Sequence, residues 1–236
     1  YPVAVPFVGN YTEEKIKKVM QILKEDFAGF DAQLIIMDVV PWMLPYYEAS
    51  GIQFEIEDNR DYMDYTFTPE QFLAGMDTQD DRYRYNYFKR RFAYETEEIT
   101  PFHREEIREF MEREWCGEKT CEECHCGCLL RVIDNLVPVF DKIRINGILV
   151  RVEGKMAGLC IVSCRNGLGV YQYKNAVNRI KGINEYLLRE SFERYLQSAD
   201  TINYTEDMGV ENLRYYKEHM APAHTLLSKL TLTERG

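Results

Sequence analysis

The chain has 236 residues, of which 45% are hydrophobic, and a formal net charge of −10. This size and composition suit one large or two small packed domains and exclude global disorder. The acidic balance argues against a protein that coats nucleic acid, although it leaves room for one local basic site. No apolar run approaches the ~20 residues that a membrane-spanning helix needs.

The ends and the cysteines set expectations about the compartment. The chain begins at Tyr1 and its first methionine is Met20, so we expect the natural N-terminus and any targeting signal to be missing. Seven cysteines are an odd count, and no secretory segment is visible. A reduced, cytoplasmic chain is the expectation.

Five of the cysteines lie close together. Cys121 and Cys124 have the two-residue gap of a zinc-binding pair, and Cys116, His125, Cys126 and Cys128 supply further ligand types. All of them lie in one short segment, however, whereas a structural zinc site usually joins two such pairs. Zinc, a redox role and a merely reduced loop all stay open, and we assign no residue as a metal ligand.

The first part of the chain alternates helical and extended patterns. Thr12 caps a helix with Glu13 and Glu14 in its first turn. Gln33–Val40 is predicted to be a buried strand, and Phe54–Glu57 alternates like another. The aromatic and acidic stretch 61–65 follows, and a helix begins at Thr68-Pro69.

Residues 82–92 interleave basic and aromatic side chains, with five Lys or Arg and no acid in 82–91. Such a pattern can grip phosphates and stack bases. The alternative is an ordinary helix that buries Tyr83, Tyr87 and Phe88 and leaves its basic side chains in solvent. Both interpretations stay open from the sequence.

The second part begins with a helix start at Thr100-Pro101, and we place a boundary just before it. The expected domains are residues 1–97 and 98–236. From Lys142 the hydrophobic period becomes two, with tight turns at 153–155 and 166–167. An antiparallel meander followed by a strand–helix crossover predicts a mixed, mostly antiparallel sheet.

Two polar segments follow the meander. Arg179, Lys181 and Gly182 lie between a strand and a helix, where free backbone N–H groups favour an anion. Asn203, Glu206 and Asp207 end the next strand, where a carboxylate can accept a proton or orient an amine. A plain connector at the first segment, and capping or loop contacts at the second, are the structural alternatives.

The order of elements resembles the GNAT superfamily of N-acyltransferases, whose pyrophosphate loop is matched by Arg179 and Gly182. A closer resemblance is to the C-terminal catalytic domain of bacterial phosphatidylglycerol lysyltransferases, which carries two GNAT-like halves in tandem. The fold implied is α+β, with mixed, mostly antiparallel sheets flanked by helices. The matching motif residues in this sequence are Asp61, Tyr62, Asp64, Tyr65, Lys174, Lys181, Gly182, Asn203, Glu206, Asp207, Gly209, Leu213, Arg214, Lys217 and Pro222, with a loose echo in 85–92.

The resemblance implies transfer of an acyl or aminoacyl group from an activated carrier to an amine or hydroxyl. The carrier is an aminoacyl-tRNA or acyl-CoA, the acceptor is a small molecule or lipid head group, and no cofactor is tightly bound. Catalytic roles fall to Lys174, Asn203, Glu206 and Asp207. The carrier-binding residues implied are Arg179, Lys181, Gly182, Arg214, Lys217, Lys89 and Arg90.

Two other functional classes remain open from the sequence. A non-catalytic protein that retains the fold to bind a ligand is one, and an interaction protein built on a metal-bound cysteine loop is the other. The oligomeric state is left open as well.

Overall fold

The computed structural model describes residues 3–4, 6, 10–27, 33–116, 129–220 and 224–234. Contacts divide the chain into two compact units. Unit 1 comprises residues 1–65, 206–217 and 225–236, and unit 2 comprises 66–205 and 218–224. The expected cysteine site at 121–128 and Pro222 lie outside the described residues, and each unit is described by itself.

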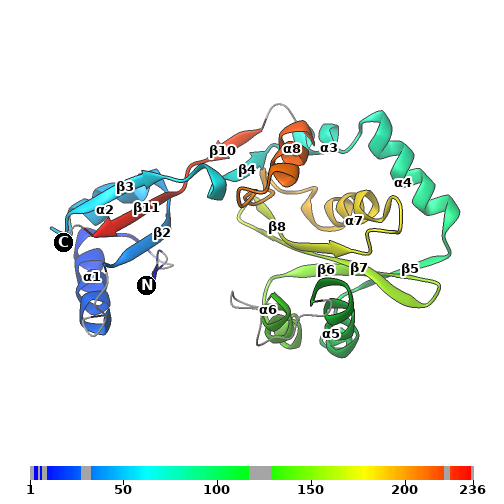
Figure 1. Ribbon diagram of the computed structural model, residues 1–236, viewed down its shortest axis with the longest axis horizontal. Coiled ribbons are helices and arrows are strands. Elements are labelled where there is room, and N and C mark those ends of the chain that lie inside the picture. Colours follow the sequence, from blue (N-terminus) through cyan, green and yellow to red (C-terminus); the bar gives the residue numbers. More distant parts are fainter. Residues whose placement is uncertain are drawn as a thin grey trace. The chain divides into compact units, whose positions relative to one another are not determined.

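Unit 1 is built on a four-stranded sheet with the order β1-β2-β11-β3 (Figure 1). β1 pairs parallel with β2, whereas β11 pairs antiparallel with β2 and β3. The core joins Ile16 and Met20 of the first helix to Ile36, Val39 and Leu232 of the sheet. The elements are β1 (Val3–Ala4), α1 (Glu13–Phe27), β2 (Ile35–Val39), α2 (Leu44–Glu48), β3 (Phe54–Asp58) and β11 (Leu230–Glu234).

Two helix starts follow the capping chemistry expected from the sequence. Thr12 accepts a hydrogen bond from the Lys15 N–H at 3.3 Å, at the start of α1. Thr68 and Gln71 form a reciprocal capping box at the start of α3 (Pro69–Gly75) in unit 2. In both cases a side-chain oxygen satisfies a backbone donor that the first turn leaves free.

Unit 2 contains strands in the order β4-β9-β8-β7-β6-β5, and the chain enters it within β4. Adjacent strands are antiparallel except β8 and β9, which pair in parallel through Leu168–Val170. The expected meander and crossover are therefore confirmed. The strands are β4 (Asp64–Phe67), β5 (Tyr94–Glu98), β6 (Asn146–Val152), β7 (Lys155–Arg165), β8 (Leu168–Ala176) and β9 (Thr201–Asn203).

Helices cover both faces of this sheet: α4 and α7 lie on one side, and α5 and α6 lie on the other (Figure 1). The buried strands carry Leu149, Leu159 and Ile161, each with no exposed surface. The helices are α4 (Gln79–Arg91), α5 (Arg104–Met111), α6 (Leu129–Leu136) and α7 (Ile183–Ser191). α8 (Glu211–Met220) and β10 (Thr225–Leu227) follow later in the chain.

The two predicted tight turns are both left-handed. Glu153 and Gly154 have φ values of 52° and 76°, and Asn166 and Gly167 have 50° and 78°. Two successive positive φ values match the twist of antiparallel strands, which explains glycine at the second position.

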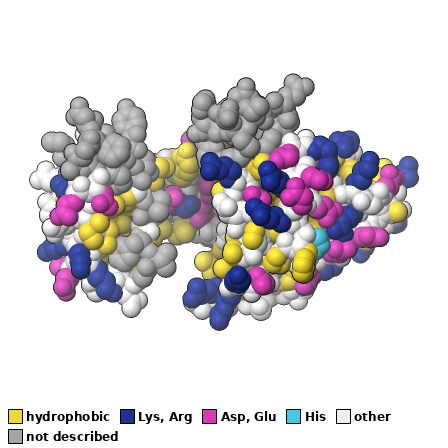
Figure 2. Space-filling view, turned by 90° about the horizontal axis from the view of Figure 1, so that it is seen from below, with side chains coloured by type: hydrophobic (Ala, Val, Ile, Leu, Met, Phe, Trp, Pro, Cys, Tyr) yellow, Lys and Arg dark blue, Asp and Glu magenta, His cyan; other side chains and the backbone are white. Residues whose placement is uncertain are grey.

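The α+β class with mostly antiparallel sheets is confirmed. The boundary between residues 97 and 98 stays a prediction about two GNAT-like halves. Within the described ranges, no helix is both long and apolar enough to cross a membrane. Seen from below, acidic, basic and hydrophobic side chains are interspersed over each unit (Figure 2).

The start of α7 packs directly on α4. Gly182 has φ 88°, and a Cβ there would lie 2.1 Å from the carbonyl oxygen of Arg84. Phe88 of α4 is fully buried, with its ring 4.8 Å from that of Tyr186 in α7. The space beside Gly182, which the sequence had suggested for a ligand, is therefore filled by the backbone of α4.

We expect Gly182→Ala to lower the free energy of unfolding by about 3 kcal/mol, because the added Cβ suffers both backbone strain and a clash. The matched control is Gly154→Ala, where φ is 76° but nothing lies within 4 Å. It should lose only about 1 kcal/mol. Urea unfolding measures both, and equal losses would show that α4 does not constrain this position.

Candidate functional site

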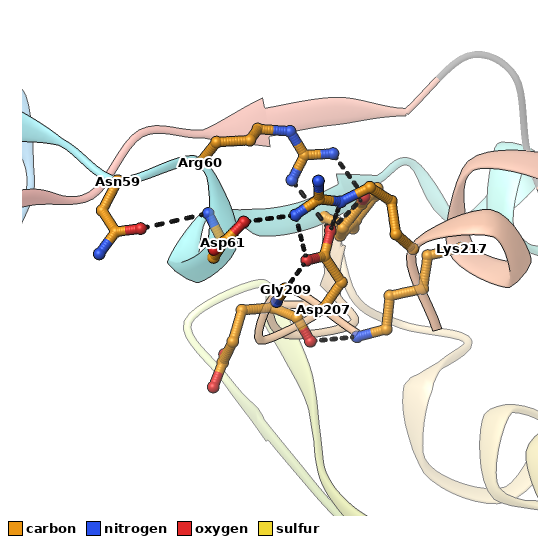
Figure 3. A network of polar contacts seen from close by, with 9 residues as sticks. Asn59, Arg60, Asp61, Asp207, Gly209 and Lys217 are labelled. Carbon is orange, nitrogen blue, oxygen red and sulfur yellow. Dashed lines mark hydrogen bonds and ion pairs between the residues drawn. The ribbon is translucent and has the colours of Figure 1, made fainter. Parts of the chain in front are cut away.

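The predicted site residues fall into separate groups. One surrounds the Asp207 carboxylate in unit 1 (Figure 3). A second lies at the end of β8 in unit 2, and a third lies on α4 of the same unit.

Asp207 is fully buried and accepts five hydrogen bonds. Its Oδ2 accepts from Arg60 Nη1 at 2.9 Å, Tyr65 Oη at 2.7 Å and Arg214 Nε at 3.0 Å. Its Oδ1 accepts from Arg214 Nη2 at 2.8 Å and the Gly209 N–H at 3.0 Å. Arg214 also donates to Asp61 at 2.6 Å. Figure 3 shows this convergence on one carboxylate.

These contacts keep the carboxylate ionised. Burial by itself raises the pKa of Asp207, but the bonds from Arg214, Tyr65, the Gly209 N–H and Arg60 hold that pKa well below its usual range. Both oxygens are already occupied, so the carboxylate is suited to orienting the two guanidinium groups. Sequence reasoning missed Arg60, although it directly precedes the Asp61-Tyr62 motif.

Glu206 and Lys217 lie beside this group in the same unit. Lys217 is 3% exposed, and its Nζ donates to the Glu206 backbone carbonyl at 2.9 Å. The Glu206 carboxylate is half-buried and lies 3.7 Å from Lys229 Nζ, which pairs with Asp64 at 2.8 Å. The Glu206 carboxylate is therefore less tightly held than that of Asp207.

Asn203, at the end of β9, serves the local turn. Its Oδ1 accepts the Thr205 N–H at 2.7 Å, where Thr205 has φ 57°. This contact stabilises a left-handed residue next to the two carboxylates in sequence.

The second group lies around the end of β8. Lys174 Nζ donates to Asn184 Oδ1, at the start of α7, at 2.9 Å. These two residues line a pocket of about 530 Å³, together with Glu114, Asn175, Ala176, Asn178 and Arg179. Arg179 has a 77% exposed side chain and lies 3.7 Å from Glu114. Asn184, which stands at the small-residue position of the GNAT loop, thus holds the lysine.

Burial perturbs two groups at this position. Cys160 stands opposite Lys174 in the β7–β8 register. Burial lowers the pKa of the Lys174 ammonium and raises the pKa of the Cys160 thiol to about 11. Cys160 is therefore a protonated thiol near neutral pH and a poor nucleophile.

The third group lies on α4, so residues 82–91 are helical, as in the second of the two interpretations left open from the sequence. Phe88 is buried as that interpretation expects, whereas Tyr83 is 50% exposed, which it does not expect. Lys181 lies over this ring, with Nζ 4.7 Å from its centroid. Lys89 donates to Tyr85 Oη at 3.2 Å and Arg90 to the Asn86 carbonyl at 3.2 Å. Neither lines the pocket at Lys174.

The described part of the chain holds no group of three or more His, Cys, Asp or Glu that fits a metal ion. The side chains of the cysteine cluster at 116–128 are not among those described, so its role stays open.

Comparisons with known proteins agree on the family and the fold. Residues 3–228 match the family described as phosphatidylglycerol lysyltransferase, C-terminal. A conserved protein of unknown function from Bacteroides thetaiotaomicron matches with TM-score 0.76 and 24% identity, over 99% of this chain and 79% of that chain. L-PGS from Bacillus licheniformis matches with TM-score 0.63 and 14% identity, over 95% and 75%.

A tandem GNAT protein from the clavulanic acid biosynthesis pathway has the same fold, with TM-score 0.53 and 11% identity over 93% of this chain and 69% of that chain. No curated protein sequence matches the chain significantly.

We expect Asp207→Asn to lower the free energy of unfolding by about 3 kcal/mol, because it leaves two arginines around a neutral buried group. Asp61→Asn is the matched control, since Asp61 also pairs with Arg214 but is 51% exposed. Its loss should stay below about 1 kcal/mol. Chemical denaturation at pH 7 measures both free energies of unfolding. Equal losses in the two variants would contradict the role of Asp207 in holding Arg60 and Arg214.

The pH dependence follows from the same group. The folded-state pKa of Asp207 lies below the unfolded value of ~3.9. Its contribution to stability is therefore complete above about pH 5 and is lost progressively as the pH falls through ~3.9 toward the folded value. The Asp207→Asn variant should therefore lose less stability than the wild type on acidification.

Lys174→Met should be at least as stable as the wild type at pH 7, because burial disfavours the Lys174 ammonium. Lys174 binds its proton more tightly in the unfolded chain than in the folded one, so the wild type's free energy of unfolding should rise as the pH approaches ~10.4. The difference in stability between the Met variant and the wild type should therefore shrink at high pH. Lys142→Met, at an exposed lysine, is the control. If Lys174→Met lowered the free energy of unfolding by more than ~1 kcal/mol at pH 7, burial would not disfavour the Lys174 ammonium as proposed.

Proposed function

Because the chain belongs to the family of phosphatidylglycerol lysyltransferase C-terminal domains, we propose that it transfers an acyl or aminoacyl group from an activated carrier to an amine or hydroxyl. The reaction forms a bond from the acceptor to the carbonyl carbon and breaks the carrier's ester or thioester bond. The acceptor's proton is passed on and ends on the leaving oxygen or sulfur. Such chemistry needs orientation, carbonyl polarisation and one proton acceptor.

The pocket at the end of β8 is the observation that carries this proposal. Arg179 supplies an exposed cation, and Asn184 in the first turn of α7 lines the same pocket. Lys174 adds an N–H donor at the same pocket. In this proposal Arg179 holds a carrier phosphate and Lys174 polarises the carbonyl. Gly182 allows the packing that shapes the loop.

In unit 1 the proposal divides the roles of two neighbouring carboxylates. Glu206 accepts the proton, because the Lys229 ammonium lies 3.7 Å from its carboxylate, farther than the donors that hold Asp207. Asp207 positions Arg214 and Arg60, whose guanidinium groups then bind an anionic part of a substrate. Lys217 fixes the backbone of Glu206.

An aminoacyl-tRNA is the donor we propose first, with acyl-CoA second. The GNAT loop usually has a small residue where this chain has Asn184, and the side chain here is engaged with Lys174. The loop is thus less open to a pyrophosphate. For the acceptor we propose an amine or hydroxyl of a small molecule or a lipid head group.

A non-catalytic ligand-binding protein is the second candidate. The full occupancy of Asp207 favours it, because a motif carboxylate is committed to structural contacts. Binding of a carrier without release of its acyl group would distinguish this candidate from an enzyme.

Thermal shift with coenzyme A, acetyl-CoA and a mixed pool of charged tRNA tests the carrier. We expect at least one to raise the Tm, and Arg179→Ala to weaken that carrier about 10-fold, as expected for losing a charged phosphate contact. Arg165→Ala is the control, since this exposed arginine lies at the other end of β7. No shift with any carrier would end the transferase proposal.

Turnover is measured as the transfer of a labelled amino acid from the donor to acceptors in a mixture of amines and phospholipids. Glu206→Gln should reduce the rate roughly 100-fold, as for loss of a general base. An unchanged rate would remove Glu206 from the mechanism.

A further inference from the structure

Tyr83 and Tyr87 of α4 and Phe92, which directly follows the helix, form a chain of ring contacts. The rings of Tyr83 and Tyr87 lie 6.1 Å apart, and those of Tyr87 and Phe92 lie 6.3 Å apart. Tyr83 is 50% exposed, and the other two are partly exposed. We call these three residues the aromatic row. A helix that used these rings only as core would bury them as it buries Phe88.

Cations accompany the aromatic row. Lys181 lies over two of the rings, with Nζ 4.7 Å from the Tyr83 centroid and 5.3 Å from that of Tyr87. Arg90 and Arg91 follow Tyr83 and Tyr87 at helical spacing on the same face. These three, and Lys155, are exposed and form no ion pair within the described residues. Arg84, by contrast, pairs with Asp80 at 2.8 Å and Glu185 at 3.5 Å.

The aromatic row ends in a cleft of about 640 Å³, to which Phe92 contributes. Its cations are Arg113, Lys155 and Arg179, and Val152, Met156, Val177 and Ile180 supply apolar surface. Glu153 also lines the cleft, and Glu114 pairs with Arg113 at 2.9 Å. The cleft thus continues the combination of flat apolar surface and positive charge.

We propose that the aromatic row and this cleft bind an unpaired nucleic-acid strand. The bases stack on Tyr83, Tyr87 and Phe92, and the phosphates lie near Lys181, Arg90, Arg91 and Lys155. A duplex hides its base faces, so it cannot use the rings. This inference rests on the proposed function in one respect: the strand is taken to be the single-stranded end of an RNA carrier.

The probe is a fluorescently labelled single-stranded RNA of about ten nucleotides, a length within the usual span of such sites, without an attached amino acid. Anisotropy should show binding that the Tyr83→Ala/Tyr87→Ala double variant weakens at least about 10-fold. Phe102→Ala is the matched control, because Phe102 is 96% exposed in the same unit. It should leave the affinity unchanged, and thermal unfolding confirms that each variant is folded.

The salt dependence supplies a second test that does not rely on the aromatic variants. Lys181→Ala should reduce the slope of log K against log salt by about 0.7, as for loss of one phosphate contact to a single strand. Arg165→Ala, which removes an exposed charge elsewhere in unit 2, should not change it.

Three results would overturn the inference: no binding of the strand to the wild type, equal binding of a blunt duplex, or equal affinity in the double variant. The outcome is separable from that of the proposed function, because the assay needs neither donor group nor acceptor. A protein that binds the strand but transfers nothing refutes only the transferase. One that transfers from acyl-CoA and ignores the strand refutes only this surface.

Discussion

The contact between α4 and the start of α7 is the constraint on which both proposed binding surfaces of unit 2 depend. Only a residue without Cβ allows the Arg84 carbonyl to lie against Gly182. This approach fixes the loop after β8, and with it Arg179, beside the pocket at Lys174. It also brings Lys181 over Tyr83 and Tyr87. One backbone contact thereby positions both the proposed carrier pocket and the aromatic row.

Unit 1 depends on a buried charge instead. A lone carboxylate in a buried position is strongly unfavourable, so Asp207 is stable there only because every lone pair direction meets a donor. Those donors come from Arg60 and Tyr65 on one segment and from Gly209 and Arg214 on another. Because both oxygens of Asp207 already accept hydrogen bonds, the carboxylate is less available to react with a substrate. A carboxylate that anchors two arginines is a poor proton acceptor, and our proposal therefore gives that task to Glu206.

The departures from the family motifs have physical explanations in this structure. Asn184 takes the place of a small residue and accepts a hydrogen bond from Lys174. Tyr204 stands where the motif of the resembled family, Asn-Arg-Glu-Glu-Asp-Leu-Gly, has its arginine. Its ring packs 5.2 Å from that of Tyr171 and 5.5 Å from that of Phe72. Each substitution is therefore built into local packing. Our proposal retains the family's reaction type and places an aminoacyl-tRNA before acyl-CoA as the donor.

The sequence by itself determined the features that act over a few residues. Capping at Thr12 and Thr68, the period of two in β6–β8 and the left-handed turns at Gly154 and Gly167 were all predictable, because their causes lie within one turn or one pleat. The motifs also led to the family. The tertiary structure alone decided that Arg60 meets Asp207, 147 residues away, that Lys217 is buried and that Tyr83 is exposed. Such contacts follow from how strands and helices are brought together, which no local pattern encodes.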